Sequence, residues 1–252
     1  MRPNDNSVKL ALSESFSGLI WKVMVHISGI LAVETRQKDR REILFSAFNY
    51  RTGETYFKNQ VFEENPNLSL AFTGARNIIL IGYKNSGTPE STGVLSVNVK
   101  DGRILWQKYN ISLNQVQEQG IQVYDSRIHP KKMFWIDHLT AEPIANPSHT
   151  HDNNDIIFPE INNSFLIPSF IQHGIIAGEI SVLEHSGKVF LSFHEKESGY
   201  YKQRIIVYQY NKILIDDILI SGIQKLQPEA FFIQLNHLFY IRDKLEIVSY
   251  LV

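Results

Sequence analysis

An internal repeat constrains the fold of this chain more than any other feature of its sequence. Gly53 recurs 49 residues later as Gly102, and two windows, 29–57 and 78–106, align at that offset without a gap. Each window reads as an apolar strand, a polar hairpin tip, a second apolar strand and a turn followed by an aromatic residue. The positions that coincide are Asn49 with Asn98, Phe57 with Trp106, and Ile30-Leu31 with Ile79-Leu80. A period of this length predicts an array of similar supersecondary units.

Weaker copies of the repeat follow in the second half of the chain. The segment from Trp135 to Ala141 places Asp137 where Asn98 stood, 39 residues later, with Thr140-Ala141 in the turn. A fourth echo covers 182–191, where a Ser-Gly pair supplies the turn. The remaining part of the chain is rich in strand-like segments but contains no clear copy of the motif.

Short apolar or alternating runs, separated by turn residues, dominate the pattern along the whole chain. They are rich in Ile, Val, Phe, Tyr and Leu, which suit a half-buried pleated surface. Turn pairs such as Asp101-Gly102 separate many of them, because glycine reaches positive φ without steric cost. The predicted strands are 29–35, 43–50, 68–73, 77–83, 94–100, 104–108, 121–124, 133–138, 155–158, 164–170, 175–183, 188–194, 203–210, 213–220, 230–235, 238–242 and 245–251. Only 112–120 and 223–232 have helical signals. The first could equally be a polar loop, and Pro228 argues against a helix in the second.

The two clear copies resemble a known repeat. The segments FSAFNYRTGETYF and VLSVNVKDGRILW are similar to the Ala-x-Asp-x-x-Thr-Gly-x-x-x-Trp repeat of quinoprotein-type β-propellers. The matching residues are Ala47, Asn49, Thr52, Gly53 and Phe57 in the first copy and Ser96, Asn98, Asp101, Gly102 and Trp106 in the second. The resemblance implies that the motif spans the third and fourth strands of a blade and ties neighbouring blades together. Both copies depart from it in having Asn for Asp, and the overall pattern also resembles an uncharacterised bacterial family seen mainly in Bacteroidota.

The need to bury apolar surface leads to the same architecture. A four-stranded antiparallel unit of this size cannot bury both of its faces alone, whereas stacking such units around an axis covers the faces and protects the edges. At this period, 252 residues make about five units. We therefore predict one all-β domain over residues 1–252, a small β-propeller of about five four-stranded antiparallel blades, irregular in its second half. The alternatives are an open twisted β-sheet or a β-sandwich. Either 19–26 or 245–251 is expected to complete the closing blade.

Composition argues against several classes of function. The chain has 26 acidic and 25 basic residues, so it lacks the basic excess typical of a nucleic-acid-binding protein. It has no cysteine, which excludes disulfides, thiolate nucleophiles and cysteine-ligated zinc. Apolar runs are too short to cross a bilayer, and the N-terminal residues lack the apolar stretch of a signal peptide. We expect a cytoplasmic monomer.

The densest polar cluster lies at 148–155. On an extended segment His149 and His151 project to the same side, and Asp152 follows them. Two imidazoles and a carboxylate are ligand types that zinc, nickel or iron sites use. Further ligands would come from His138, His173 or His194. The same residues also fit a solvated loop between two prolines, so we expect no cofactor. If a cofactor binds, these ligand types favour a divalent metal.

Other polar groups have both a chemical and a structural interpretation. His185, His194 and Glu195 include residue types suited to acid–base chemistry, but they also fit the polar ends of a surface hairpin. Asp216 and Asp217 are adjacent on a predicted strand, so they point to opposite faces and cannot share a proton. We expect them to be solvated.

Two further sets of residues are expected to have structural roles. The mixed-charge run 36–42 fits a solvated hairpin tip. Trp21, Trp106 and Trp135 could stack on a flat ligand, but blade cores use large aromatic residues routinely. Trp106 occupies the aromatic position of the repeat, so we assign it to packing.

The sequence favours a binding role over an enzymatic one. It contains no Gly-rich phosphate loop, no G-x-S-x-G elbow and no H-E-x-x-H pair. We therefore expect a non-enzymatic binding or scaffold propeller with a protein or small-molecule partner. The alternative is a metal-dependent hydrolase or lyase with a site near the ring centre, at His149, His151 and Asp152.

Metal content separates these two hypotheses. If the cluster holds a metal, the purified protein should carry it in stoichiometric amount, and the double variant His149→Ala, His151→Ala should lose it. Elemental analysis of both proteins after identical purification measures this. Wild-type protein without bound metal would contradict the enzymatic alternative.

Overall fold

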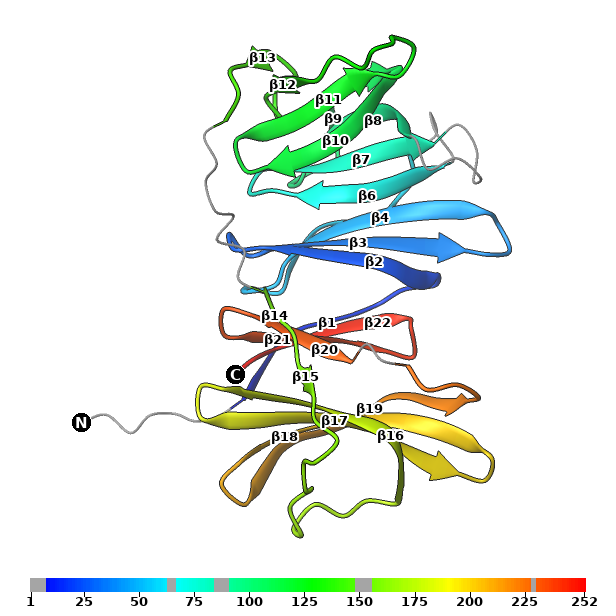
Figure 1. The fold of residues 1–252 in the computed structure, drawn as a ribbon, viewed down its shortest axis with the longest axis vertical. Coiled ribbons are helices and arrows are strands. Elements are labelled where there is room, and N and C mark those ends of the chain that lie inside the picture. The colour runs from blue at the N-terminus through cyan, green and yellow to red at the C-terminus, as the bar shows by residue number, and fades with distance from the viewer. Residues whose placement is uncertain (1–7, 63–66, 84–90, 148–155, 228–229) are drawn as a thin grey trace, which may run out of the picture. The chain divides into compact units, whose positions relative to one another are not determined.

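Antiparallel strands are the only extended regular elements in the computed structural model, which describes residues 8–62, 67–83, 91–147, 156–227 and 230–252 (Figure 1). Within these ranges there is no helix, and the strands form five separate antiparallel sheets. The chain divides into two compact units. The middle unit is residues 16–154, and the terminal unit joins residues 1–15 to 155–252.

The middle unit contains three four-stranded sheets, each built from consecutive strands. The first is β2 (Leu19–His26), β3 (Ile30–Gln37), β4 (Glu42–Asn49) and β5 (Glu54–Gln60). The second is β6 (Leu68–Thr73), β7 (Asn77–Tyr83), β8 (Ser91–Asn98) and β9 (Ile104–Tyr109). The third is β10 (Ile111–Gln117), β11 (Gly120–Asp125), β12 (Phe134–Ile136) and β13 (Pro143–Ile144).

The terminal unit contains two five-stranded sheets. One has the order β1-β22-β21-β20-β14, formed by β1 (Lys9–Ser15), β22 (Glu246–Leu251), β21 (His237–Arg242), β20 (Phe231–Gln234) and β14 (Ile156–Ile157). The other runs in chain order through β15 (Glu160–Ile161), β16 (Ile175–His185), β17 (Lys188–Glu197), β18 (Tyr200–Gln209) and β19 (Lys212–Ile223).

The predicted all-β architecture of about five antiparallel blades is confirmed, including its irregularity in the second half, where β12 to β15 have only two or three residues. The closing strand differs in part from expectation. The C-terminal strand β22 pairs with β1, so the two ends of the chain meet in one sheet. Residues 19–26 instead form β2, the first strand of the sheet that follows, because they pair with β3.

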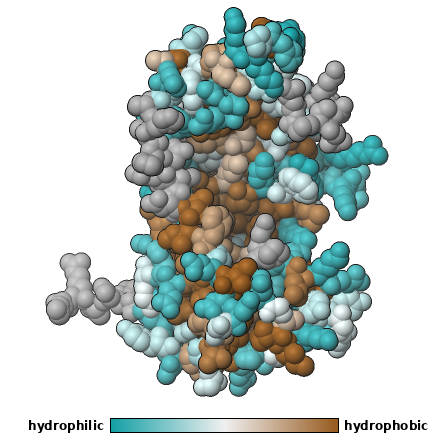
Figure 2. Space-filling model, viewed as in Figure 1, coloured by the Kyte–Doolittle hydropathy of each residue, from teal (hydrophilic) through white to brown (hydrophobic). Residues whose placement is uncertain are grey.

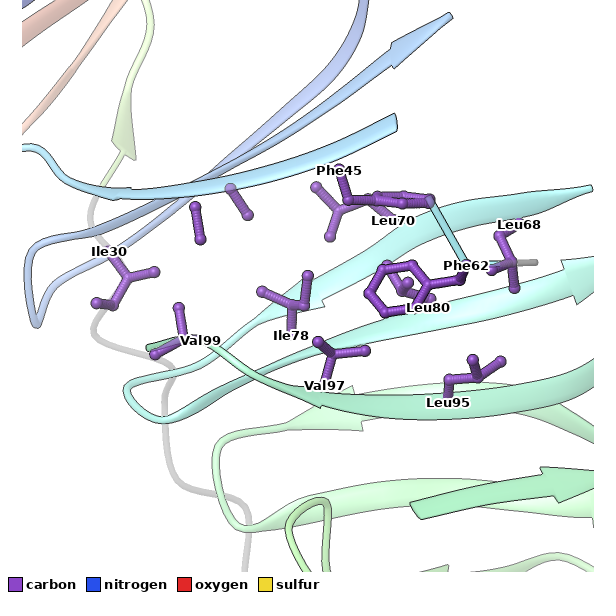
Figure 3. Close-up of a cluster of buried hydrophobic side chains, with 12 residues drawn as sticks. Ile30, Phe45, Phe62, Leu68, Leu70, Ile78, Leu80, Leu95, Val97 and Val99 are labelled. Carbon is purple, nitrogen blue, oxygen red and sulfur yellow. The ribbon is translucent and has the colours of Figure 1, made fainter. Parts of the chain in front are cut away.

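The second sheet of the middle unit, β6 to β9, is apolar on both faces. Ile78 and Leu80 of β7 pack toward the first sheet, in the cluster drawn in Figure 3, while Ile79 packs into a second cluster with the third sheet. All three side chains are fully buried. A sheet covered on both faces has near-continuous apolar strands, which explains why β7 reads Asn-Ile-Ile-Leu-Ile rather than alternating.

The repeated turn has the same hydrogen bonds in all three sheets of the middle unit. The side chain of Asn49, Asn98 or Asp137 accepts a hydrogen bond from the backbone N–H two residues later, at 2.7–3.0 Å. The N–H four residues after each of these residues donates to its carbonyl, at 2.8–2.9 Å. That donor residue has φ of 75° at Gly53, 70° at Gly102 and 61° at Ala141. The degraded third copy is therefore confirmed as a structural copy.

The register of the first hairpin corrects the gapless alignment of the two clear copies. Ile30 pairs with Asn49, whereas Asn98 pairs with Asn77, which lies two residues before Ile79. The second hairpin is therefore longer by two residues. The offset of 49 residues holds for the second strand and the turn, where Asn and Gly have a structural role. The offset does not hold for Ile30-Leu31, because many different apolar residues can occupy the same buried position.

The terminal unit replaces this turn with tighter ones, which explains why the motif fades after the third copy. Ser186-Gly187 and Ser198-Gly199 each connect two strands with both residues at positive φ. This is the geometry of a two-residue type I′ hairpin. Such a turn needs no capping Asn or Asp. The echo at 182–191 is therefore a hairpin of a different kind.

The helical signal at 112–120 and one predicted strand are wrong. Residues 112–120 are not helical: most of them lie in β10, where Leu113 packs into a core that favours an extended strand. Residues 223–232 form no helix in their described part, as the proline in that segment indicated. Residues 164–170 form no strand, because the N–H of Phe165 donates to Asn162 and that of Ile171 to Pro168, folding the segment over β17 and β18.

The left-handed turn residue is a position where stability can be tested. Gly53→Ala and Gly102→Ala should each lower the free energy of unfolding by about 1–2 kcal/mol, because an L-residue is strained at positive φ. Gly102→Ala should cost more, since its Cβ would lie 1.8 Å from Oε1 of Gln60. Urea denaturation measures both.

Gly93→Ala is the matched control. Gly93 lies in β8 without positive φ, and the nearest atom to an added Cβ is a carbonyl oxygen at 3.6 Å. Its stability should stay within experimental error of the wild type. Equal losses in all three variants would contradict the role of backbone conformation.

Candidate functional site

The predicted metal-binding residues, His149, His151 and Asp152, lie outside the described residues. Two of their proposed supporting ligands are engaged elsewhere. Both ring nitrogens of His138 have partners at 2.8 Å, the side chain of Asn77 and the carbonyl of Glu118. Nδ1 of His173 lies 2.9 Å from the carbonyl oxygen of Gly174. Within the described ranges no three His, Asp or Glu residues converge on a possible metal site.

The aromatic residue of the second repeat copy helps to hold two sheets of the middle unit together. Nε1 of Trp106 donates to the carbonyl of His138 at 3.2 Å. The same carbonyl accepts from Asn77 at 2.8 Å and from Ser96 at 2.7 Å. The assignment of Trp106 to packing is confirmed, and His138 contributes through its backbone as well as its ring.

Trp21 is not a core residue. Its side chain is 60% exposed, and the guanidinium of Arg36 lies 4.1 Å from its ring centroid. Arg36 in turn donates two hydrogen bonds to the fully buried carboxylate of Glu34, at 2.8 and 2.9 Å. Arg36 therefore does not belong to the solvated hairpin tip, where the sequence analysis placed it.

Glu34 is a buried charge that the sequence analysis missed. Its second carboxylate oxygen accepts from Ser69 at 2.9 Å and from the N–H of Leu70 at 2.8 Å, which links β3 to β6. A buried carboxylate is tolerated only when it is paired and hydrogen-bonded, as it is here. The only sequence signal was a single Glu inside an apolar strand, two residues before an Arg.

The predicted acid–base residues do not form one site. His185 lies at the end of the β16–β17 hairpin, while His194 and Glu195 are adjacent on β17 and point to opposite faces. Both are buried, at 5% and 3% exposure, so the expected surface hairpin is wrong at this end. His194 is covered by the segment after β19, and Glu195 is covered by two cationic side chains of β18.

Glu195 begins a network of charges on one face of the β17–β18 pair. It accepts from Lys202 at 2.9 Å and from Arg204 at 3.0 Å. Arg204 reaches across to β19, where Nε donates to Asp216 at 2.6 Å, and it also donates to the carbonyl of Gln172 at 2.8 Å. Arg204 thus fixes the positions of two carboxylates and one loop.

The neighbouring residue Asp217 belongs to a second network, on the opposite face of β19. It accepts from the hydroxyl of Tyr240 at 2.7 Å and from Arg242, which also donates to Glu246 at 2.8 Å. The prediction that Asp216 and Asp217 point apart is confirmed. The expectation that they are solvated is wrong, since each is held by an arginine.

These contacts keep the charged residues ionised. Burial acts to raise the pKa of Glu195, but hydrogen bonds and positive charge from Lys202 and Arg204 outweigh it and lower that pKa. Hydrogen bonding to Asp216 is the main cause that raises the pKa of Arg204. Burial opposes the charge on Arg242, yet the contact with Asp217 raises its pKa. The network is a fixed array of charges rather than a set of groups that exchange protons near neutral pH.

A groove of about 630 Å³ runs beside β19, which is the terminal strand of its sheet. Side chains from β18, β19 and the end of β21 line it, and Ile218, 45% exposed, adds an apolar surface. The lining residues are Lys202, Arg204, Asp216, Asp217, Ile218, Ser221, Arg242 and Asp243. The carbonyl of Leu219 accepts from the N–H of Asp243 at 2.7 Å, and in the described part of the chain no strand pairs with the outer edge of β19.

The surface around this unit is mixed in character. On the face of the terminal unit that Figure 2 shows, hydrophobic side chains are interspersed with hydrophilic ones. The charged groove is therefore distinguished by its fixed charges and its open strand edge rather than by hydrophobicity. No helix in the described ranges has the length and apolar character of a membrane span.

Comparisons with known proteins give a partial family match and distant structural similarity. The model of a domain of unknown function, DUF4905, matches residues 26–106, which cover the two clear repeat copies. No curated protein matches the chain.

Among solved structures, BamB from Moraxella catarrhalis is similar over 98% of this chain and 89% of its own, with a TM-score of 0.39 and 10% identity. An exo-beta-1,3-galactanase from Phanerochaete chrysosporium has a TM-score of 0.29 and 8% identity over 94% of this chain and 64% of its own. A eukaryotic initiation factor has a TM-score of 0.30 and 10% identity over 94% of this chain and 54% of its own. Similarity of this degree says nothing about ligand or activity.

The charge network predicts a specific dependence of stability on pH. Because the pKa of Glu195 is lower in the folded protein than in the unfolded chain, its contribution is fully present above about pH 4.3 and is lost as the pH falls through the folded pKa. Glu195→Gln should lower the free energy of unfolding at pH 7 by about 1.5–3 kcal/mol. It should also flatten the loss of stability below pH 4.3.

Urea denaturation between pH 3 and pH 7 tests this, with Glu160→Gln as control. Glu160 is an exposed glutamate of the same unit, so its replacement should leave the pH dependence as it is in the wild type. If the stability of Glu195→Gln falls with decreasing pH as it does in the wild type, the buried carboxylate does not govern the pH dependence of unfolding.

Proposed function

We propose that this protein is a non-catalytic binding protein, and that the groove beside β19 holds an extended, basic segment of a partner protein. The observation that carries the proposal is the outer edge of β19, with which no described strand pairs, bordered by ion-paired charges and by the carboxylate of Asp243. The proposal concerns the terminal unit alone and places no catalytic step in the groove.

The strand edge supports binding by strand addition. β19 is 12 residues long and is the last strand of its sheet. The carbonyl of Leu219 already accepts from Asp243. An extended peptide can pair with the rest of this edge through main-chain hydrogen bonds, while alternate side chains enter neighbouring pockets. The groove of about 630 Å³ lies where those side chains would fall.

The charges support a basic partner. Three cations, Lys202, Arg204 and Arg242, and three carboxylates, Asp216, Asp217 and Asp243, line the groove. Glu195 and Glu246 contact the same arginines from outside the lining. Each cation already has a carboxylate partner, so an acidic segment would have to displace an ion pair. A lysine or arginine side chain would instead meet Asp243, the lining carboxylate that forms no ion pair within the described residues, and such complementarity determines specificity and association rate.

A pair of synthetic peptides tests the proposal. A labelled peptide of five Lys-Thr repeats should bind with an affinity that falls as salt is added, whereas five Glu-Thr repeats should bind more weakly. Asp243→Asn should weaken the Lys-Thr peptide roughly two- to five-fold, the effect of one exposed charge. Fluorescence anisotropy measures all three affinities.

Two controls separate groove binding from general attraction. Asp101→Asn removes a similarly exposed charge from the middle unit and should leave the affinity unchanged. A Lys-Thr peptide methylated on alternate backbone nitrogens keeps its charge but cannot complete a strand, so it should bind weakly. Equal affinity of the Lys-Thr and Glu-Thr peptides, or an Asp243→Asn variant that binds like the wild type, would overturn the proposal.

A further inference from the structure

A second hollow lies in the terminal unit, on the face of β17 opposite Glu195. It has a volume of about 230 Å³. Its lining residues are Ile161, Gly178, Glu179, Ser181, Ser192, His194, Gln203, Leu226 and Gln227. We call it the β17 pocket, and the charge networks beside β19 take no part in it.

An irregularity in β16 creates the space. Ala177 pairs with His194 and Ser181 pairs with Ser192, so three residues of β16 stand opposite one residue of β17. Gly178, within this bulge, has φ of 73°, a conformation that favours glycine. A Cβ at Gly178 would approach Leu226 to 2.5 Å, so the absent side chain also leaves room at the pocket wall.

The wall of the pocket is polar where the packing pattern calls for apolar residues. Along one face of β17, Phe190 belongs to the core of the unit, but the next residues on that face are Ser192 and His194. On β18, Ile205 belongs to the same core, and the next residue on that face is Gln203. These three polar side chains are only 2%, 5% and 3% exposed. A local break in an otherwise consistent pattern is typical of a functional site.

The buried hydroxyl of Ser192 has no hydrogen-bond partner within the described chain. An unsatisfied buried polar group is destabilising, and natural proteins contain few of them. Other buried hydroxyls of the described residues, among them Thr35 and Thr73, also lack a partner, but Ser192 lines this pocket, where a ligand atom can provide one.

The segment after β19 closes one side of the pocket. The N–H of Gln227 donates to Nε2 of His194 at 3.1 Å, and Nε2 of Gln203 donates to the carbonyl of Gln227 at 3.2 Å. Because Nε2 of His194 accepts, the proton of the neutral ring lies on Nδ1. Burial lowers the pKa of His194, which keeps the ring neutral.

The remaining lining residues define the chemistry of a ligand. Glu179, exposed at the rim, is the one lining residue among those described whose side chain is charged at neutral pH. Ile161 and Leu226 provide apolar walls, and the described lining contains no Phe, Tyr or Trp ring for stacking on a sugar or a base. The volume is below the roughly 300–1,000 Å³ of sites for drug-sized ligands, so the ligand is small.

We propose that the β17 pocket binds a small amino alcohol or a related ammonium compound, with the ammonium group at Glu179 and the hydroxyl at Ser192. The carboxylate at the rim attracts the cation, and an anion would meet only negative charge there. The ligand hydroxyl can either donate to the serine hydroxyl or accept from it, and either arrangement supplies the missing hydrogen bond.

Three probes of similar size test the charge selectivity: ethanolamine, ethylene glycol and glycolate. Protein labelled with ¹³C-histidine reports binding through the ring signals of His194, assigned by comparison with His194→Gln. Ethanolamine should shift these signals in a saturable way, ethylene glycol more weakly, and glycolate not at all. Glu179→Gln should abolish the preference for ethanolamine over ethylene glycol. Glycolate that binds as well as ethanolamine would overturn the proposal, as would three probes that leave His194 unaffected.

Ser192→Ala distinguishes a binding role from a structural one. It should weaken ethanolamine about tenfold or more, which corresponds to the loss of one hydrogen bond to a buried group. It should also raise the urea concentration at which the ligand-free protein unfolds, because the unsatisfied hydroxyl is gone. Ser164→Ala, an exposed serine of the same unit that does not line the pocket, should change neither quantity. Reduced stability of Ser192→Ala, or unchanged ethanolamine binding, would contradict a ligand-binding role for this hydroxyl.

Discussion

The burial of both faces of the second sheet of the middle unit, β6 to β9, is the constraint on which the rest of that unit depends. In the middle unit, successive residues of β7 enter two different cores, so the sheet they belong to has no face that could be left to solvent. Removing apolar surface from water stabilises the fold by roughly 25 cal/mol per Å², and each sheet gains this only through its neighbours. Turns and polar contacts between sheets then determine how neighbouring sheets are held.

Two kinds of polar contact hold neighbouring sheets of the middle unit in position. The carbonyl of His138 receives three donors from the neighbouring sheet, and the carboxylate of Glu34 receives two from β6. Both acceptors are met by several donors, so their desolvation is compensated. Hydrophobic burial alone is non-directional, whereas these bonds define which residues stand opposite one another.

The sequence predicted the architecture because its signals are local. Strands rich in β-branched residues, glycine turns and the repeated Asn or Asp are all set by contacts within a few residues, so most strands and three equivalent turns could be found. The register of the two hairpins could not be predicted in the same way. Ile30-Leu31 and Ile79-Leu80 are identical in sequence but differ in register, because apolar residues are interchangeable in a core. The strand β10 has a polar, helix-like sequence, and only its tertiary packing makes it extended.

The candidate sites were harder to find from sequence because they depend on residues brought together from several strands. Asp216 and Asp217 were recognised as diverging, but their partners Arg204 and Arg242 lie on different strands, with no spacing that indicates the pairs. The β17 pocket depends on a bulge in β16 and on a loop after β19. A polar residue inside an apolar strand, as at Glu34, Ser192 and Gln203, is the signal that could have located all of these sites.

The pairing of β1 with β22 determines the order in which the chain can fold during synthesis. A ribosome completes the middle unit before β16 to β22 exist, so that unit can form its own sheets while the strand at 9–15 still lacks its partner. Contacts between residues so distant in sequence are costly in chain entropy and form slowly. The terminal unit is therefore the last to form, and until then β1 remains an unpaired strand that a chaperone or a second nascent chain could capture.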